Sequence, residues 1–164
     1  MYDAAALLAG NEGALADAID ALTPELYRYA AGILLSSADA ADAVQTAFVR
    51  LWRRRADIRD ASAVRAYLYR CTLRACIDIQ RKRRLFVPVP QSDAPKPMSD
   101  ALADALRRLS PEERAIVYER AVDDTPYAEL AERLGMREAT VRKKYERAKK
   151  KLAAMLKGDA KHGE

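Results

Sequence analysis

Apolar residues recur at steps of three or four along most of this chain, which is the spacing of one face of an α-helix. Thr23 and Pro24 predict the start of a first helix, because threonine caps helices and proline is tolerated in the first turn. Ser36 and Ser37 interrupt this helix, and a second helix is predicted from near Asp39. The apolar face of the second helix comprises Val44, Ala47, Phe48, Leu51 and Trp52.

A loop is predicted at residues 57–62, and a third helix follows it and ends in a basic run at residues 81–84. Asp60 or Ser62 is the expected cap of this helix, since both side chains can accept a hydrogen bond from the first turn. The apolar positions of the third helix are Val64, Leu68, Cys71, Ala75 and Ile79.

Helix boundaries are marked more clearly in the C-terminal half. Ser110 and Glu113 have the spacing of a capping box, and Pro111 lies at the first helical position between them. Residues 125–126, Thr-Pro, predict the start of a further helix, and Gly135 predicts its end in the left-handed conformation.

Four of the seven prolines lie between Pro88 and Pro97, so residues 86–99 are predicted to form a flexible linker. The linker divides the chain into domains at residues 1–85 and 100–160. The chain contains 33 alanines, the best helix former and a residue that is depleted in strands. The expected fold class is therefore all-α, with two small helical domains. Apolar runs are only a few residues long, so we expect no membrane-spanning helix.

Charge alternates along the chain. Residues 1–49 carry a net charge of −6, residues 50–84 of +9, residues 85–134 of −4 and residues 135–164 of +6. Each half thus has an acidic part followed by a basic part. Two separated basic blocks suggest two contacts with a polyanion.

The last two predicted helices have the pattern of a helix-turn-helix, with a glycine turn at Gly135 and the small Ala131 where the helices cross. The last helix is predicted over residues 138–156, with Val141, Tyr145, Ala148, Leu152 and Met155 on its inner face. Basic and hydroxyl groups on the outer face suit a major groove and its phosphates. These groups belong to Arg137, Thr140, Arg142, Lys143 and Arg147. The structural alternative is a helical hairpin with a solvated basic face.

The basic helix over residues 62–84 interleaves aromatic and basic side chains. Rings can stack on unpaired bases while guanidinium groups hold phosphates, so this pattern suits opened DNA. The alternative is that the tyrosines belong to the core and that the terminal basic run complements the helix dipole. The residues concerned are Tyr67, Tyr69, Arg70, Arg74, Arg81, Lys82 and Arg83.

Side chains that commonly carry catalysis or bind metals are scarce. Cys71 and Cys76 are five residues apart, which places them on different faces of a helix, and we expect both to be buried apolar residues. His162 is the single histidine of the chain. We therefore expect no catalytic residue, no metal site and no cofactor.

Three groups of motifs occur in order along the chain. Residues 42–52 read DAVQTAFVRLW, and residues 67–81 contain YLYR, ID and a final arginine. Residues 109–114 read LSPEER, and residues 127–148 contain YAELA, LGM, TVR and RA. Together they resemble bacterial sigma-70 family factors of the extracytoplasmic-function (ECF) type. The first group is similar to the core-binding helix of region 2, the second to its promoter-melting and −10 recognition helix, and the third to region 4, which reads the −35 element.

The resemblance implies that the protein binds RNA polymerase core through its beta and beta-prime subunits and directs it to promoter DNA. An anti-sigma factor is a further candidate partner, and a cytoplasmic location, on the nucleoid when active, would follow. The implied core-binding residues are Asp42, Gln45, Thr46 and Trp52. The implied −10 residues are Asp60, Tyr67, Arg70, Arg74, Arg81 and Lys82. The implied −35 residues are Arg137, Thr140, Arg142, Lys143 and Arg147.

Four positions depart from the usual family pattern. Thr46 stands where the family usually has glutamate, and Tyr67 where a tryptophan is common. Arg74 stands where asparagine is common, and Arg137 where a serine or threonine often caps the last helix. These differences bear on the preferred −10 bases and on the strength of core binding.

Two other functions are compatible with parts of the sequence. A helix-turn-helix regulator that binds duplex DNA would explain the C-terminal half, although it leaves the tyrosine-arginine helix without a role. A metal-dependent nuclease would need paired carboxylates, for which Asp39 with Asp42 and Asp123 with Asp124 are the local pairs. Both pairs lie at predicted helix starts, where capping explains them. Trp52 can likewise belong to the core rather than to a docking surface.

Overall fold

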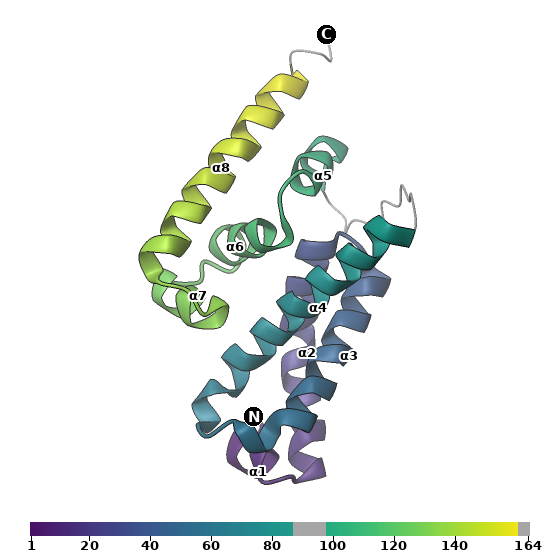
Figure 1. Ribbon diagram of the computed structural model, residues 1–164, viewed down its shortest axis with the longest axis vertical. Coiled ribbons are helices and arrows are strands. Elements are labelled where there is room, and N and C mark those ends of the chain that lie inside the picture. Colours follow the sequence, from purple (N-terminus) through teal and green to yellow (C-terminus); the bar gives the residue numbers. More distant parts are fainter. Residues whose placement is uncertain (87–97, 161–164) are drawn as a thin grey trace.

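The computed structural model describes residues 1–86 and 98–160, and within them the chain forms α-helices and two short 3-10 helices (Figure 1). The all-α class is therefore confirmed. Of the predicted linker at residues 86–99, residues 87–97 lie outside the described residues. The helices are α1 (Ala4–Leu8), α2 (Glu12–Leu34), α3 (Ser37–Arg54), η1 (Arg55–Asp57), η2 (Ala61–Ala63), α4 (Val64–Phe86), α5 (Asp100–Arg107), α6 (Pro111–Ala121), α7 (Tyr127–Leu134) and α8 (Glu138–Ala160).

The N-terminal domain is a bundle of α2, α3 and α4, with the short α1 against the lower end of α2 (Figure 1). Ser36 caps α3, because its hydroxyl accepts a hydrogen bond from the backbone N–H of Asp39 at 3.4 Å. The helix predicted from near Asp39 therefore begins two residues earlier. The predicted apolar faces of α3 and α4 supply much of the core, which includes Val44, Ala47, Phe48, Leu51, Val64, Leu68, Cys71 and Ala75.

The expected helix start at Thr23 and Pro24 is wrong. Asn11 caps α2, and the helix runs through Pro24 without a break. Proline removes one backbone hydrogen bond inside a helix. Leu22 and Leu26 are buried on either side of it. Burial of an apolar face, rather than local propensity, supplies most of a helix's stability in a protein, so α2 tolerates this loss.

The C-terminal domain, α5–α8, has the predicted helix boundaries at three places. The capping box of Ser110 and Glu113 is present, and Gly135 ends α7 with φ of 65° in the left-handed region. The segment after Thr125 and Pro126 forms α7, and α8 continues four residues past its predicted end at residue 156. The core of the helix-turn-helix α7–α8 consists of Ile116, Leu130, Ala131 and Val141.

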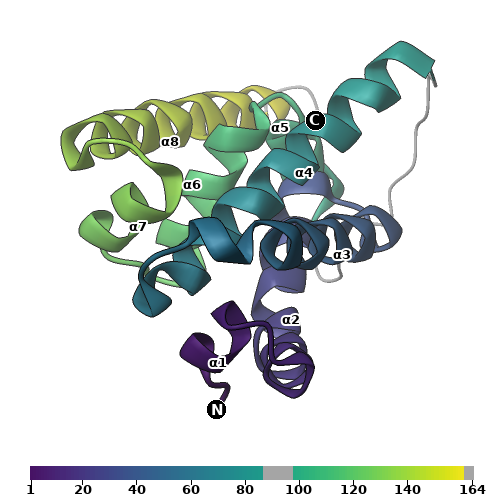
Figure 2. The same ribbon diagram turned by 60° about the horizontal axis from the view of Figure 1, so that its bottom comes forward.

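The two domains pack against each other, with α6 on α2 and both α6 and α7 on α4 (Figure 2). Ala115 of α6 belongs to the N-terminal core, and Leu35 at the end of α2 packs with Leu106, Leu109 and Ala148 of the C-terminal domain. The sequence predicted two domains joined by a linker and gave no sign of this contact. We call this arrangement the closed packing.

None of the helices within residues 1–86 and 98–160 has an apolar stretch of the length that a bilayer crossing requires.

Candidate nucleic-acid interface

A pocket of about 1100 Å³ lies between α3, the segment that carries η1 and η2, and the first half of α4. Four of the six residues expected at the −10 element line it, namely Asp60, Tyr67, Arg70 and Arg74. Arg81 and Lys82 are exposed further along α4 and do not line the pocket. We call this cavity the basic pocket.

Three arginines that the sequence did not single out for this site also line the basic pocket: Arg50, Arg54 and Arg59. Arg50 pairs with Asp78 at 3.0 Å and Arg54 with Asp57 at 3.1 Å. These ion pairs hold the two arginines along the pocket wall. The residues that line the pocket still carry more positive than negative charges. The net charge of +9 over residues 50–84 was the available signal, but it could not say which arginines share a cavity.

The two tyrosines of α4 have different environments. Tyr67 is half-buried at the basic pocket. Burial is the main cause that raises the pKa of its phenol, and the neighbouring Cys71 adds to it. Tyr69 is 2% exposed and packs on Tyr29 with ring centroids 4.9 Å apart. The core alternative is therefore correct for Tyr69, while Tyr67 keeps a ring on the pocket wall.

Asp60 organises the loop at the mouth of the basic pocket. Its carboxylate accepts a hydrogen bond from the backbone N–H of Ser62 at 2.9 Å and caps η2. Hydrogen bonding from Ser62 lowers the pKa of this exposed carboxyl, which favours its charged form. Asp60, not Ser62, is thus the cap of the segment that leads into α4.

The C-terminal domain presents a second basic surface on α8. All five residues expected at the −35 element are exposed on the first half of α8 or, for Arg137, just before it: Arg137, Thr140, Arg142, Lys143 and Arg147. Arg142 pairs with Glu138 at 2.9 Å and lies over the ring of Tyr127 at 4.2 Å. We call this surface the α8 face.

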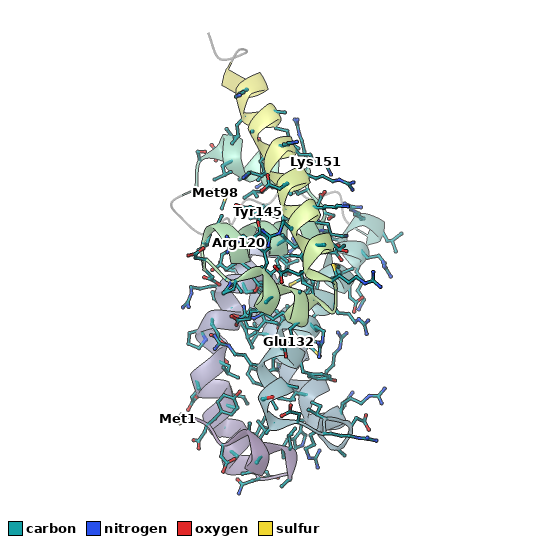
Figure 3. All side chains as sticks on the ribbon, turned by 90° about the vertical axis from the view of Figure 1, so that its left-hand side faces the viewer. Met1, Met98, Arg120, Glu132, Tyr145 and Lys151 are labelled. Atoms are coloured by element: carbon teal, nitrogen blue, oxygen red, sulfur yellow. The ribbon has the colours of Figure 1, made fainter. Side chains whose placement is uncertain are left out.

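Two ion pairs hold α8 against α6. Lys144 pairs with Glu112, and Lys151 pairs with Glu113 at 2.5 Å. Figure 3 shows Lys151 on the upper part of α8, well above Glu132 at the end of α7. Together with the buried Val141 and Ala148, these pairs fix the orientation of the α8 face.

An apolar groove of about 430 Å³ lies between α2 and α3, which we call the α2–α3 groove. Gln45 and Trp52, two of the four residues expected to bind core polymerase, line it. Asp42 is exposed one turn before Gln45, and the hydroxyl of Thr46 donates to the carbonyl of Asp42 at 2.8 Å. Neither of these two lines the groove.

Sequence reasoning missed the wall that α2 contributes to the groove, which includes Leu15, Ile19 and Tyr27. Ile19 and Val49 are 37% and 43% exposed, values that are high for large apolar residues in a small domain. Trp52 is half-buried at the groove, with the guanidinium of Arg55 at 4.1 Å from its ring. The indole of Trp52 is therefore neither buried in the core nor fully exposed to solvent.

In each carboxylate pair considered for a nuclease, one member forms an ion pair with an arginine. Asp39 forms an ion pair with Arg83, and Asp124 pairs with Arg120 at 3.3 Å. In the described part of the chain, His, Cys, Asp and Glu side chains form no group of three or more that could hold a metal ion.

A basic pocket and a basic helix-turn-helix lie on the same chain, an arrangement that is typical of proteins that bind DNA. Comparison with known families agrees with this assignment. The family model described as Sigma-70 region 2 matches residues 18–86, and the one described as Sigma-70, region 4 matches residues 99–152.

Relatives of this chain include the ECF RNA polymerase sigma factor SigM of Mycobacterium tuberculosis, 34% identical over 143 residues that cover 80% of this chain and 71% of SigM. The RNA polymerase sigma-E factor of Streptomyces coelicolor is 33% identical over 141 residues, which cover 80% of this chain and 79% of that factor. SigL of M. tuberculosis is 31% identical over 163 residues, covering 90% of this chain and 92% of SigL.

Two solved structures have a similar fold. CnrH, solved in complex with the cytosolic domain of CnrY, has a TM-score of 0.73 and 26% identity, covering 95% of this chain and 96% of CnrH. The sigma factor RpoE of Bartonella quintana, solved with the anti-sigma factor NepR, has a TM-score of 0.66 and 20% identity, covering 86% of this chain and 95% of RpoE.

The chain therefore belongs to the sigma-70 family, in its ECF subfamily. Its function is promoter-directed initiation of transcription, and members of this family are DNA-binding initiation factors.

Proposed function

We propose a division of this activity among three surfaces of the chain: the α2–α3 groove docks on RNA polymerase core, the basic pocket holds the opened −10 strand, and the α8 face reads the −35 duplex. The observation that carries the proposal is the difference in shape between the two basic surfaces. One is a walled pocket and the other is an exposed helix face.

The basic pocket fits a single strand better than a duplex. It offers one half-exposed ring, Tyr67, among arginines on several walls. A flipped base can stack on a ring while guanidinium groups hold the neighbouring phosphates. Arg74 is exposed at the same pocket and would hold the strand next to the base that Tyr67 receives.

The α8 face fits a major groove. A helix-turn-helix inserts its second helix so that N-terminal side chains reach base edges, while others contact phosphates. Thr140, Arg142 and Lys143 lie in the first turns of α8 and are proposed to read bases. Arg147 lies one turn further and is proposed to contact phosphate.

The α2–α3 groove fits an apolar helix face of a partner. Exposed apolar side chains that surround a groove mark interaction sites in proteins. Gln45 and the exposed Asp42 add polar groups near it, and residues 1–49 carry a net charge of −6, so a partner with basic flanks is favoured. We propose RNA polymerase core, through its beta and beta-prime subunits, as this partner.

Protein partners other than polymerase belong to the proposal as well. CnrH was solved in complex with the cytosolic domain of CnrY. We propose that an anti-sigma factor regulates the present chain, and that it acts by binding the free factor.

The test is run-off transcription with purified core polymerase over a library of promoter sequences, together with co-purification of core. Val49→Asp introduces a charge into the α2–α3 groove and is expected to abolish co-purification and transcription. Val122→Asp is the matched control, because Val122 is 65% exposed on the C-terminal domain outside the groove. Equal core binding by both variants would place the docking surface elsewhere.

A further inference from the structure

We propose that the N-terminal helix α1 positions the η1–η2 segment, residues 55–63, so that the basic pocket can select the bases of the −10 strand. Leu7 is the positioning residue, because it anchors α1 without lining the pocket itself. This inference rests on the proposed function of the pocket. Three observations carry it: the exposure of the η1–η2 segment, the packing of α1 on it, and the place of Arg55.

The η1–η2 segment forms one wall of the basic pocket but has little packing of its own. Five of its residues line the pocket: Asp57, Ile58, Arg59, Asp60 and Ala63. None of residues 55–63, each of which the structure describes, is buried. Within the segment, the backbone N–H of Ala63 donates to the carbonyl of Asp60 at 3.0 Å. A segment with so few buried contacts takes its position from the elements that it lies against.

Helix α1 is one of these elements, since it packs on both η1 and η2 as well as on α2. Figure 1 shows α1 at the lower end of the N-terminal domain, where α3 leads into α4. The helices α3 and α4 also contact the segment, but they are its direct neighbours along the chain. No residue from Ala4 to Leu8 lines the basic pocket, so α1 can influence the pocket only through the segment that it supports.

A single leucine anchors α1. Leu7 is 0% exposed and belongs to the core of the N-terminal domain, and Ile58 of the η1–η2 segment packs against the same core. Asp3 caps the start of α1, because its carboxylate accepts a hydrogen bond from the backbone N–H of Ala6 at 3.0 Å. A helix of five residues is not stable in isolation, so the burial of Leu7 is what keeps α1 in place.

Arg55 makes a second connection between the N-terminus and the η1–η2 segment. Gly10, in the turn between α1 and α2, has φ of 91°, and a Cβ atom there would lie 3.4 Å from Nε of Arg55. The guanidinium of Arg55 also donates to the backbone carbonyl of Trp52 and lies 4.1 Å from the centre of its ring. The first residue of η1 is therefore held between the N-terminal turn and the end of α3.

A displaced η1–η2 segment would change base selection more than phosphate binding. Asp60 and Tyr67 line the pocket from different elements, so their separation depends on where the segment lies. A flipped base is distinguished by groups at hydrogen-bonding and stacking distance, which a small shift removes. The attraction between an arginine and a phosphate falls more gradually with distance. Loss of the support from α1 is therefore expected to lower discrimination among −10 sequences.

Four variants test the proposal. Leu7→Ala removes the anchor of α1, and Leu7→Met keeps an apolar side chain of similar volume there. Ile33→Ala is the matched control: Ile33 is also 0% exposed in the same core, lies near the opposite end of α2 from α1, and lines neither the pocket nor the α2–α3 groove. Arg55→Met removes the second connection, and Arg55 is half-buried outside the core, so this variant is expected to fold.

Hydrogen exchange of the free full-length protein measures how firmly the η1–η2 segment is held. In Leu7→Ala and Arg55→Met, the backbone N–H groups of residues 58–63 are expected to exchange about tenfold faster than in the parent. Leu7→Met and Ile33→Ala are expected to match the parent in this segment. Circular dichroism at the same temperature verifies that each variant is folded.

Run-off transcription with core polymerase, over promoters that carry substitutions in the −10 element, measures base selection. Leu7→Ala and Arg55→Met are expected to lower the rate on the preferred −10 sequence, relative to substituted sequences, by about tenfold. A loss of this size is part of what one base–aromatic contact provides. Because the quantity compared is a ratio of rates, differences in core binding cancel. Leu7→Met and Ile33→Ala are expected to keep the ratio of the parent.

The proposal is overturned if Leu7→Ala folds and keeps the −10 selectivity of the parent. It is also overturned if Ile33→Ala loses as much selectivity, which would show a general effect of lost stability. If Leu7→Ala does not fold, Arg55→Met decides by the same criteria.

Tyr67→Ala separates these failures from a failure of the proposed function. If Tyr67→Ala alters −10 selectivity and Leu7→Ala does not, only the role of α1 is overturned. If neither variant alters it, the proposed role of the basic pocket is overturned together with that of α1.

Discussion

The two basic surfaces of this sigma factor differ in how they are supported. The α8 face is one side of a single helix, held from behind by Val141, Ala148 and two ion pairs to α6. The basic pocket is assembled from α3, the η1–η2 segment and α4, and the closed packing adds Leu134 from the other domain to its wall. One surface is complete within its own domain, and the other depends on where the neighbouring domain lies.

This difference matches the two forms of DNA that they are proposed to bind. A duplex is a stiff rod that an exposed helix can approach directly, and its binding is dominated by phosphate contacts. A single strand in a pocket lies among side chains from several walls. A small movement of one wall can therefore exclude the strand.

The largest expected effect breaks the α8 face while leaving intact the part of the pocket wall that the N-terminal domain provides. Leu130 is fully buried in the cluster that holds α7 and α8 together. Leu130→Ala is expected to lower the free energy of unfolding by about 2–5 kcal/mol, as in other buried leucine sites, and to abolish −35 duplex binding. Chemical denaturation and duplex binding by anisotropy measure the two effects.

Val122→Ala serves as the control for this variant, because Val122 is exposed and its truncation should cost almost nothing. Single-strand binding by Leu130→Ala should persist. Its loss in parallel with duplex binding would show that the two surfaces do not act independently.

The next effect concerns promoter opening. Tyr67→Ala is expected to reduce initiation on a fully duplex promoter by about 10- to 100-fold, since one base–aromatic contact contributes about 1–3 kcal/mol. Arg74→Ala is expected to reduce initiation as well, because it removes a charge that holds the opened strand. On the same promoter with a pre-mismatched bubble, Tyr67→Ala should recover substantially if the ring drives melting. Arg74→Ala should recover less, because it holds the strand itself. Equal and unrescued losses with normal folding would indicate a structural role for both residues.

A smaller effect lies in the pH dependence of stability at the domain contact. Burial raises the pKa of Glu119 from 4.5 to about 7, against the opposing effect of Arg133. Because the folded protein binds this proton more tightly than the unfolded chain does, the stabilisation is complete below about pH 4.5 and is lost as the pH rises through about 7. Glu119→Gln cannot titrate. Between about pH 5 and pH 8, the unfolding free energy of the parent should fall relative to this variant by about 1–3 kcal/mol.

Denaturant unfolding of both proteins across this pH range checks the prediction. The difference between their free energies of unfolding cancels the contributions of titratable groups that the two proteins share. A difference that does not change with pH would mean that the Arg133 pair holds the Glu119 carboxylate ionised throughout.

The smallest expected effect tests which residues of the α8 face contact phosphates and which contact bases. Arg147→Ala is expected to weaken binding to all −35 sequences alike and to reduce the slope of log affinity against log salt by about one. Lys157→Ala, exposed near the end of the same helix, should have less effect. Substitution of Arg142 or Lys143 should instead change base preference. A loss confined to one base position on replacing Arg147 would contradict its assignment to phosphate.

Local rules predicted many helix ends because the chemistry of a cap is local. Ser110, Glu113 and Gly135 act within a few residues of their own positions, and the structure confirms all three. Pro24 shows where such rules stop. Its local preference favours a helix start, but buried leucines on both sides keep α2 continuous. The short helices α1 and α5 are five and eight residues long, too short for a three- to four-residue period to repeat several times.

The candidate sites also differ in how far the sequence could predict them. The α8 face was predictable because its five residues lie within eleven positions of one another, at the start of α8 and just before it. The basic pocket was predictable only in part, since helical spacing placed Tyr67, Arg70 and Arg74 together but could not bring Arg50 or Arg54 from α3 to join them. The groove wall from α2 was missed for the same reason.

The sequence by itself determined the all-α class, the helix-turn-helix, the two basic blocks and the family resemblance, because each depends on residues that are close along the chain. Only the tertiary structure decided that Tyr69 is buried while Tyr67 lines a pocket, that Gly32 receives the ring of Tyr118, and that Arg70 donates to Glu132 of the other domain. These contacts join residues far apart in sequence. Their formation depends on the shapes of two packed surfaces, which no spacing along a single helix encodes.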